Sequence, residues 1–220
     1  MLSYVSNVIF VYAQSKVTRN AIAGGKRKYF YEPLNIKPMR KVMFAMNISI
    51  DGCYSHTFAA PDEELMAYFT RLMHNTGVIV YGRKTYELMV PYWPDVAKNK
   101  TGNPEDIAFA EAMVPIEKIV VSRTLKNVPE NTRIVSENPE GLLRELKQQP
   151  GKTIALSSTT MLPRMLDMGL VDELKLIVHP VIVAENKHLF DTVSVKTNFN
   201  LAETMQFKSG VIALHYQKRE

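Results

Sequence analysis

The sequence predicts an α/β protein with a mainly parallel, twisted sheet, helices on both faces of the sheet and an antiparallel C-terminal edge. Two observations carry this prediction. Short β-branched apolar runs alternate with segments of helical periodicity from residue 41 to about residue 170, which is typical of parallel sheets. Two later apolar runs flank Ser209-Gly210 and predict a hairpin. With 220 residues, 46% of them hydrophobic, the chain suits one domain with a sizeable core.

Residues 1–38 differ in composition from the rest of the chain. Eight of the 27 Lys and Arg residues fall within residues 1–41, where Glu32 is the single acid, so residues 42–220 carry 19 cations and 21 acids. The composition fits an organelle transit peptide, and equally an extension ahead of an internal start at Met39. We expect a poorly ordered leader over residues 1–38 and one folded domain over residues 39–220.

The first half of this domain begins with a buried strand and an amphipathic helix. Pro61 and the three acids after it suit the N-terminal end of a helix, and Leu65 and Leu72 continue at helical spacing. Pro91 and Pro94 are expected to end a second helix. We expect strands over residues 41–48 and 78–81, helices over residues 62–75 and 85–89, and a surface loop over residues 98–105.

The second half continues the alternation and then becomes rich in strands. Gly151 follows one predicted helix and Gly169 closes the next, as is common at helix C-termini. A long β-branched segment then precedes the C-terminal hairpin. The expected strands cover residues 118–122, 153–156, 173–183, 200–207 and 211–217, and the expected helices cover residues 140–147 and 161–168.

Several functional classes lack their sequence signatures in this chain. Neither GxGxxG nor GxxxxGK[ST] occurs, so the Rossmann fingerprint and the P-loop are absent, as is the zinc-deaminase signature. The single cysteine, Cys53, cannot form an internal disulfide, and the five histidines show no metal-binding spacing. Residues 42–220 carry a net charge close to zero, which argues against a nucleic-acid partner. The apolar run at residues 8–13 is too short to cross a membrane.

Three predicted strands end in residues that suit an anion. The carboxyl ends of parallel strands share one edge of a sheet, where ligands bind in such folds. Gly82 permits close approach of a ligand, and Arg83 beside it can hold a phosphate through two hydrogen bonds. We therefore expect a phosphate-rich ligand at this edge. The three junctions read Gly82-Arg83-Lys84-Thr85, Ser122-Arg123-Thr124 and Ser157-Ser158-Thr159-Thr160.

Five motifs in series carry a family resemblance. They are AMNISIDG (45–52), YGRKTYE (81–87), IVVSR (119–123), GLVDELKLIVHPVIV (169–183) and LFD (189–191). Together they resemble the dihydrofolate reductase-like superfamily, in the branch similar to the C-terminal reductase domain of bacterial riboflavin-biosynthesis deaminase-reductases. The similarity spans residues 39–219. It implies an NADPH-dependent reductase that transfers a hydride to a pterin-like or ribosylaminopyrimidine-like heterocycle.

The resemblance also implies roles for individual residues and a state of assembly. Ala45 is expected near the nicotinamide, and Ser122 and Arg123 near the adenosine 2′-phosphate. Family members often pair through their late strands, so we expect a homodimer, located in the cytoplasm unless residues 1–38 direct it to an organelle. The remaining residues expected to contact the cofactor are Gly82, Arg83, Lys84, Thr85, Ser157, Ser158, Thr159 and Thr160.

Two acids are candidates for the carboxylate that helps to protonate the substrate. Asp51 matches a position that is commonly Asp in this branch; alternatively it is a turn residue before Gly52. Glu64 lies near the corresponding place on the first helix; alternatively it is a solvated acid at the helix start. Tyr92 and Trp93 are expected either to wall the substrate pocket or to pack in the core.

The chain departs from the family at two turns. Ser157-Ser158 stands where the family usually has Gly-Gly or Gly-Ser, and each added Cβ takes space from the pyrophosphate. Ala184-Glu185-Asn186 replaces a Gly-rich turn. These changes leave open a second hypothesis, a non-catalytic nucleotide-binding or interaction protein that keeps the reductase fold. A third hypothesis places a nucleic-acid or membrane partner on residues 1–41.

Overall fold

The computed structural model describes residues 15–19, 29–33, 39–55, 58 and 62–219. The chain divides into two units, Met1–Pro38 and Met39–Glu220. In the first unit, β1 (Ser15–Arg19) pairs antiparallel with β2 (Tyr29–Pro33). The other residues of the leader expected over residues 1–38 lie outside the described residues.

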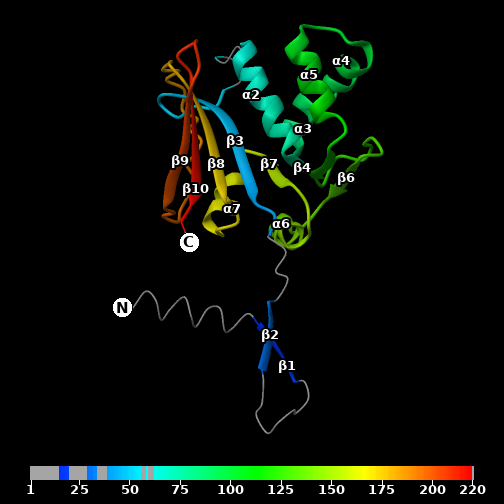
Figure 1. Cartoon of the computed structure of the whole chain (residues 1–220). Coiled ribbons are helices and arrows are strands. Elements are labelled where there is room, and N and C mark those ends of the chain that lie inside the picture. The colour runs from blue at the N-terminus through cyan, green and yellow to red at the C-terminus, as the bar shows by residue number, and fades with distance from the viewer. Residues whose placement is uncertain (1–14, 20–28, 34–38, 56–57, 59–61, 220) are drawn as a thin grey trace. The chain divides into compact units, whose positions relative to one another are not determined.

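In the described part of the second unit, a single eight-stranded sheet forms the framework (Figure 1). Its strands are β3 (Val42–Ser49), β4 (Thr76–Gly82), β5 (Glu117–Val121), β6 (Thr132–Val135), β7 (Thr153–Ser157), β8 (Glu173–His179), β9 (Phe199–Gln206) and β10 (Ile212–Lys218). Their order in the sheet is β6-β5-β4-β7-β3-β8-β10-β9. The first six run parallel, whereas β10 is antiparallel to both β8 and β9. This topology confirms the predicted fold class.

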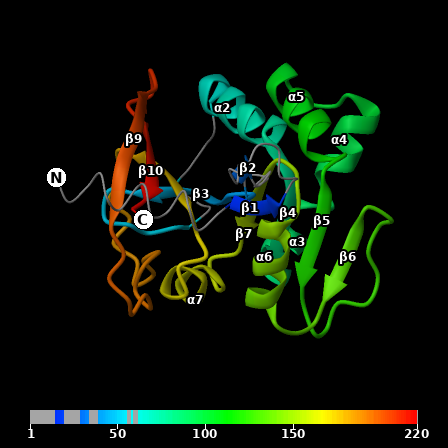
Figure 2. The ribbon, with the colours of Figure 1, turned by 60° about the horizontal axis from the view of Figure 1, so that its bottom comes forward.

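Helices cover both faces of the sheet (Figure 2). Successive strand residues point to opposite faces, so the neighbouring residues Ile79 and Val80 of β4 pack against two different groups of helices. Ile79 packs against the first of the groups given below, and Val80 packs against the second. None of the described helices is long and apolar enough to cross a bilayer. The first group is α2 (Glu63–His74), α3 (Arg83–Met89), α4 (Trp93–Asn99) and α5 (Pro104–Met113), and the second is α6 (Pro139–Gln148) and α7 (Leu162–Asp167).

Residues 91–113 differ from the prediction. Pro94 belongs to the first turn of α4 rather than only ending α3, a position where its missing N–H costs little. The loop expected over residues 98–105 shrinks to residues 100–103, because Asn103 caps α5 by accepting the N–H of Asp106 at 2.7 Å. Trp93 packs against Phe109 of α5, with ring centroids 4.7 Å apart. The apolar residues of α5 form no single stripe along the helix, so their spacing in the sequence does not predict a helix there.

Two strands also differ from the prediction. The four-residue β6 was missed because it alternates weakly, with Thr132 its one buried residue. The strand expected over residues 173–183 ends at His179, since Pro180 has no N–H to continue the ladder. The remaining predicted strands and helices are present within two residues of their expected bounds.

Candidate functional site

The carboxyl ends of three neighbouring strands lie side by side. β4 lies between β5 and β7, and the register pairs Gly82 with Val121 and Tyr81 with Ser157. Ser122 directly follows Val121 of β5, and Ser158 directly follows Ser157 of β7. The two serines therefore flank the end of β4. The structure thus brings together the three junctions that the sequence singled out.

Gly82 and Ser158 are in close contact at this edge. A Cβ atom on Gly82 would lie 2.5 Å from the Oγ of Ser158 and 3.1 Å from its Cβ, too close for any other residue without movement. The Ser158 side chain is 3% exposed, and its Oγ accepts the backbone N–H of Met161 at 3.2 Å at the start of α7. Ser158, at the second position of the Ser157-Ser158 pair, is thus a fixed part of the turn.

Ser122 forms a similarly fixed turn after β5. Its buried Oγ accepts the N–H groups of Thr124 at 3.2 Å and Leu125 at 3.0 Å. The side chains of Arg123 and Thr124 are exposed beyond this turn. A guanidinium is therefore presented from a rigid base, which lowers the entropy lost when it binds an anion.

The cationic side chains at this edge differ in whether they form ion pairs. Arg83 donates from Nη1 to the Glu87 carboxylate at 2.9 and 3.1 Å, and both side chains are more than 40% exposed. Such a helical pair contributes only about 0.3–0.5 kcal/mol, so Arg83 can exchange it for a phosphate. Within the described residues, Lys84 and Arg123 have no ion-pair partner. The hydroxyl residues Thr85 and Thr159 are half-buried, and Thr160 is exposed.

Asp51 is tied into the turn that follows β3. Its carboxylate accepts the Oγ–H of Ser49 at 2.5 Å and the backbone N–H groups of Val183 at 3.3 Å and Ala184 at 2.9 Å. The Ser49 hydroxyl and then these N–H groups hold the pKa of Asp51 well below its usual range. The carboxylate therefore stays ionised near neutral pH and joins the β3 turn to the segment after β8.

Glu64 lies in the first turn of α2 and contacts the turn between β9 and β10. Its carboxylate accepts the backbone N–H of Lys208 at 2.9 Å and pairs with the Lys208 ammonium at 3.0 Å. These two contacts, in that order, lower the pKa of Glu64. Ala45 is half-buried in β3, Tyr92 is exposed, and Trp93 packs on α5 as described above.

A buried polar pair escaped the sequence analysis. His179 ends β8 and is 6% exposed, and its Nε2 lies 3.0 Å from Oδ1 of Asn47 in the adjacent β3. The Phe58 ring packs edge-on against His179, with centroids 5.5 Å apart. Burial lowers the pKa of His179, while the negative charge of Asp62 opposes this shift. The sequence feature that indicates this pair is the alternation of side chains along β3, which puts Asn47 and Ser49 on the same face of the sheet as His179.

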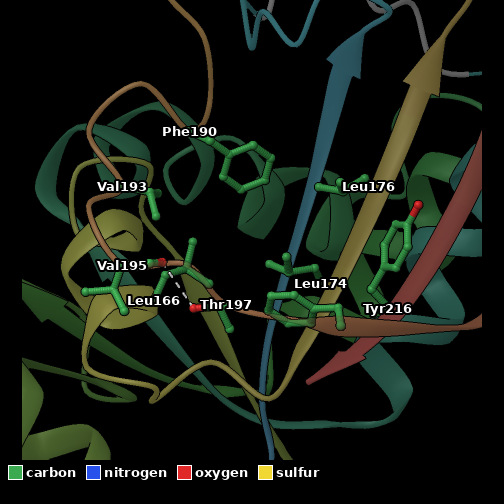
Figure 3. Close-up of a pocket in the computed structure, with 9 residues that line it drawn as sticks. Leu166, Leu174, Leu176, Phe190, Val193, Val195, Thr197 and Tyr216 are labelled. Atoms are coloured by element: carbon green, nitrogen blue, oxygen red, sulfur yellow. Dashed lines mark hydrogen bonds between the residues drawn. The ribbon is translucent and has the colours of Figure 1, made fainter. Parts of the chain in front are cut away.

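An apolar cavity of about 330 Å³ lies elsewhere, between α7, β8, β10 and the segment before β9 (Figure 3). Leu166, Leu174 and Leu176 line it together with Phe190. None of its nine lining residues is charged, so its chemistry does not suit a phosphorylated ligand.

Comparison with known proteins adds the family. Residues 40–213, most of the chain, match the RibD C-terminal domain family. The chain belongs to this family. The resemblance predicted from the motifs is thereby confirmed, and membership of the RibD C-terminal domain family supports a reductase-type activity. An uncharacterised relative, YyaP of Bacillus subtilis, is 29% identical over 186 residues, which cover 83% of this chain and 96% of YyaP.

Solved structures share the fold of the RibD C-terminal domain family at low sequence identity. A candidate riboflavin biosynthesis protein from Shewanella sp. PV-4 matches with a TM-score of 0.61 and 16% identity, covering 82% of this chain and 99% of its own. A pyrimidine reductase-like protein from Corynebacterium diphtheriae matches at 0.56 and 15%, covering 86% and 96%. Acinetobacter baumannii RibD matches at 0.54 and 15%, covering 83% of this chain and 59% of RibD.

One departure from the RibD C-terminal domain pattern has a visible backbone consequence. Ala184, in the turn that is usually Gly-rich, has a φ of 57°. This left-handed conformation suits glycine and costs a residue with a Cβ of order 1 kcal/mol. The strained turn is held by its N–H bond to Asp51.

Proposed function

We propose that the chain is an NADPH-dependent reductase that transfers a hydride to a pterin-like or ribosylaminopyrimidine-like heterocycle. The observation that carries the proposal is the meeting of Gly82, Ser122 and Ser158 at one sheet edge in a RibD-type fold. This edge is where ligands of open parallel sheets bind.

The residues at this edge fit a phosphorylated dinucleotide. Arg123 and Lys84 lack ion-pair partners among the described residues, and Arg83 is held only by an exposed pair. Guanidinium groups bind phosphate with paired, charge-assisted hydrogen bonds. NADPH has one more phosphate than NADH, so this set of cations favours NADPH. When bound, the cofactor supplies the hydride, and the chain binds and orients both partners.

The substrate side of the proposed site is formed by Asn47, His179 and Asp51. His179 is neutral near pH 7 because burial lowers its pKa. When Nε2 donates to Oδ1 of Asn47, Nδ1 is left to accept an N–H of the heterocycle. Asp51 is ionised, so it suits an orienting role through hydrogen bonds better than the donation of a proton.

Oxidation of NADPH, followed by its absorbance, tests the activity. The purified protein is mixed with NADPH and a dihydropterin or a ribosylaminopyrimidine, and the His179→Gln variant serves as the matched control. We expect oxidation with at least one of these substrates and a slower rate in the variant. NADPH binding without oxidation of any of them would contradict the reductase.

That contradicting outcome is what the second candidate function, a nucleotide-binding protein without turnover, predicts. Two observations favour it: Ser157-Ser158 stands where the family usually has Gly-Gly or Gly-Ser, with the Ser158 side chain filling the space beside Gly82, and Ala184 is strained in a turn that is usually Gly-rich. Both changes lie at turns that contact the ligand in the proposed site.

A further inference from the structure

Three metal-ligating side chains meet beside the turn after β3. Asp51, Cys53 and His188 each offer a ligand atom, and these atoms lie within 4.8 Å of one another. Local spacing in the sequence gave no sign of this group, because His188 is far away along the chain. Backbone contacts hold it in place: Cys53 and His188 form a β-bridge, and the Leu189 N–H donates to the Gly52 carbonyl at 3.0 Å.

Two oxygen atoms that accept hydrogen bonds from the Cys53 thiol lie at distances close to those between ligands of a tetrahedral zinc ion. The Sγ of Cys53 lies 3.6 Å from Oδ2 of Asp51 and 3.2 Å from the carbonyl oxygen of Glu185. Zn–S and Zn–O bonds of about 2.3 and 2.0–2.2 Å at a tetrahedral angle place sulfur and oxygen roughly 3.5–3.6 Å apart. The sulfur and its two oxygen neighbours are therefore already spaced nearly as ligands of one ion would be.

The surroundings of the group also suit ligation. Asp191 lies 3.4 Å from Nδ1 of His188 and accepts its backbone N–H at 3.1 Å, and a carboxylate in this position orients a ligating imidazole. Asp51 is ionised and oriented by its hydrogen bonds to the β3 turn and the 183–184 backbone. Cys53 is fully buried, but the His188 side chain is 40% exposed, which gives an ion access.

We propose that Asp51, Cys53 and His188, with the Glu185 carbonyl as fourth ligand, bind one zinc ion. Binding replaces the thiol proton of Cys53, so one proton is released for each ion bound through this sulfur. The ion fastens the turn after β3 to the strained segment that contains Ala184. This site shares Asp51 with the proposed substrate side but contains none of the strand-end cations, and its test does not depend on reductase activity.

Cobalt titration of the full chain, freed of metal with a chelator, tests the site. Cys53 is the single cysteine, so a thiolate-to-cobalt charge-transfer band reports this site alone. We expect one Co²⁺ per chain, with that band and tetrahedral d–d bands, all bleached by Zn²⁺. His188→Ala is expected to weaken binding at least about 10-fold, and His74→Ala, a change of an exposed histidine, is expected to have no effect.

Cys53→Ser controls for the sulfur and keeps the size of the side chain. Its circular dichroism melting curve and that of His188→Ala show whether each variant is folded. A folded Cys53→Ser protein that lacks the charge-transfer band supports the site. Absence of that band in the parent protein, or binding that is equally tight in folded His188→Ala, would overturn the proposal.

Discussion

Gly82 and Ser158 pack so tightly that a Cβ on Gly82 would lie 2.5 Å from the Oγ of Ser158. The contact joins the ends of β4 and β7, which belong to two different junctions of the candidate cofactor site. Ser158 in turn is held by the N–H of Met161. The spacing of these two strand ends is therefore fixed by one glycine and one buried serine.

Gly82→Ala should destabilise the protein by about 1–3 kcal/mol, because the added methyl group overpacks a buried contact. Ser158→Gly in the same chain removes the opposing side chain and should restore most of that stability. Urea unfolding of the parent, both single variants and the double variant gives the coupling free energy. Equal destabilisation by Gly82→Ala in both backgrounds would show that the contact is not the cause.

Arg83→Ala should weaken NADPH binding by about 1–3 kcal/mol, because a charged hydrogen-bond pair to phosphate is lost. Glu87→Gln is the matched control, since it frees Arg83 from its 2.9 Å ion pair without removing the guanidinium. Calorimetric titration should give unchanged or tighter NADPH binding for Glu87→Gln. If the two variants weaken binding alike, Arg83 does not contact the cofactor.

His179→Ala should raise the KM for the heterocyclic substrate about 10-fold or more and leave the Kd for NADPH unchanged. The reason is that Asn47 loses its buried hydrogen-bond partner, whereas the cofactor cations lie in α3 and in the turn after β5. His74→Ala, at an exposed histidine, should change neither constant. A parallel loss of NADPH affinity in folded His179→Ala would place His179 in the cofactor site.

His179 should also contribute to acid sensitivity. Its pKa in the folded protein is below the ordinary value of 6.5, because burial disfavours the charged form. The unfolded chain therefore binds more protons, and the free energy of unfolding should fall as the pH drops below about 6.5. His179→Gln should make this decline shallower without abolishing it, since burial also lowers the pKa of His215. Unfolding curves between pH 7 and pH 5 measure the difference.

Lys118 should give a pH dependence of the same sign in mild alkali. Its Nζ donates to the carbonyl groups of Met113, Val114 and Ile116 at the end of α5, and burial lowers its pKa to about 8. Above pH 8 the folded protein releases this proton before the unfolded chain does. Stability should therefore rise by up to about 1 kcal/mol per pH unit between pH 8 and pH 10.

The control for this prediction is Lys118→Met, which removes the titrating group and fills similar space. Its unfolding free energy, measured in urea at the same pH values, should lack the alkaline rise. A rise of the same size in both proteins would assign it to other groups.

The parts of the fold that could be predicted from sequence are those with strong local signals. Apolar runs bounded by turns identified β4 and β7, and Asp62 marked the start of α2. In contrast, α5 has no single apolar stripe, and its stabilising features are tertiary: the cap from Asn103 and the buried ammonium of Lys118. Those features are not visible until the chain is folded.

The cofactor side of the candidate site could be predicted from the sequence better than its substrate side. Gly82, Ser122 and Ser158 each follow a strand, and parallel strands end at one edge, so their meeting could be expected. The partnership of Asn47 with His179 could not, because it depends on β8 pairing with β3 across more than a hundred residues. The predicted catalytic roles of Asp51 and Glu64 stay predictions. Asp51 accepts a hydrogen bond from Ser49, which pairs with His179 in the sheet, and Glu64 forms an ion pair with Lys208.

The most direct test of the proposed cofactor site is calorimetric titration of the parent protein and Arg123→Ala with NADPH and with NADH. Arg123 is exposed beyond a rigid turn and has no ion-pair partner among the described residues, so its loss should not disturb the fold. We predict that the parent binds NADPH at least about 10-fold more tightly than NADH, and that Arg123→Ala loses this preference. Absence of binding to either cofactor at millimolar concentration, or equal affinity of the parent for both, would contradict the NADPH site.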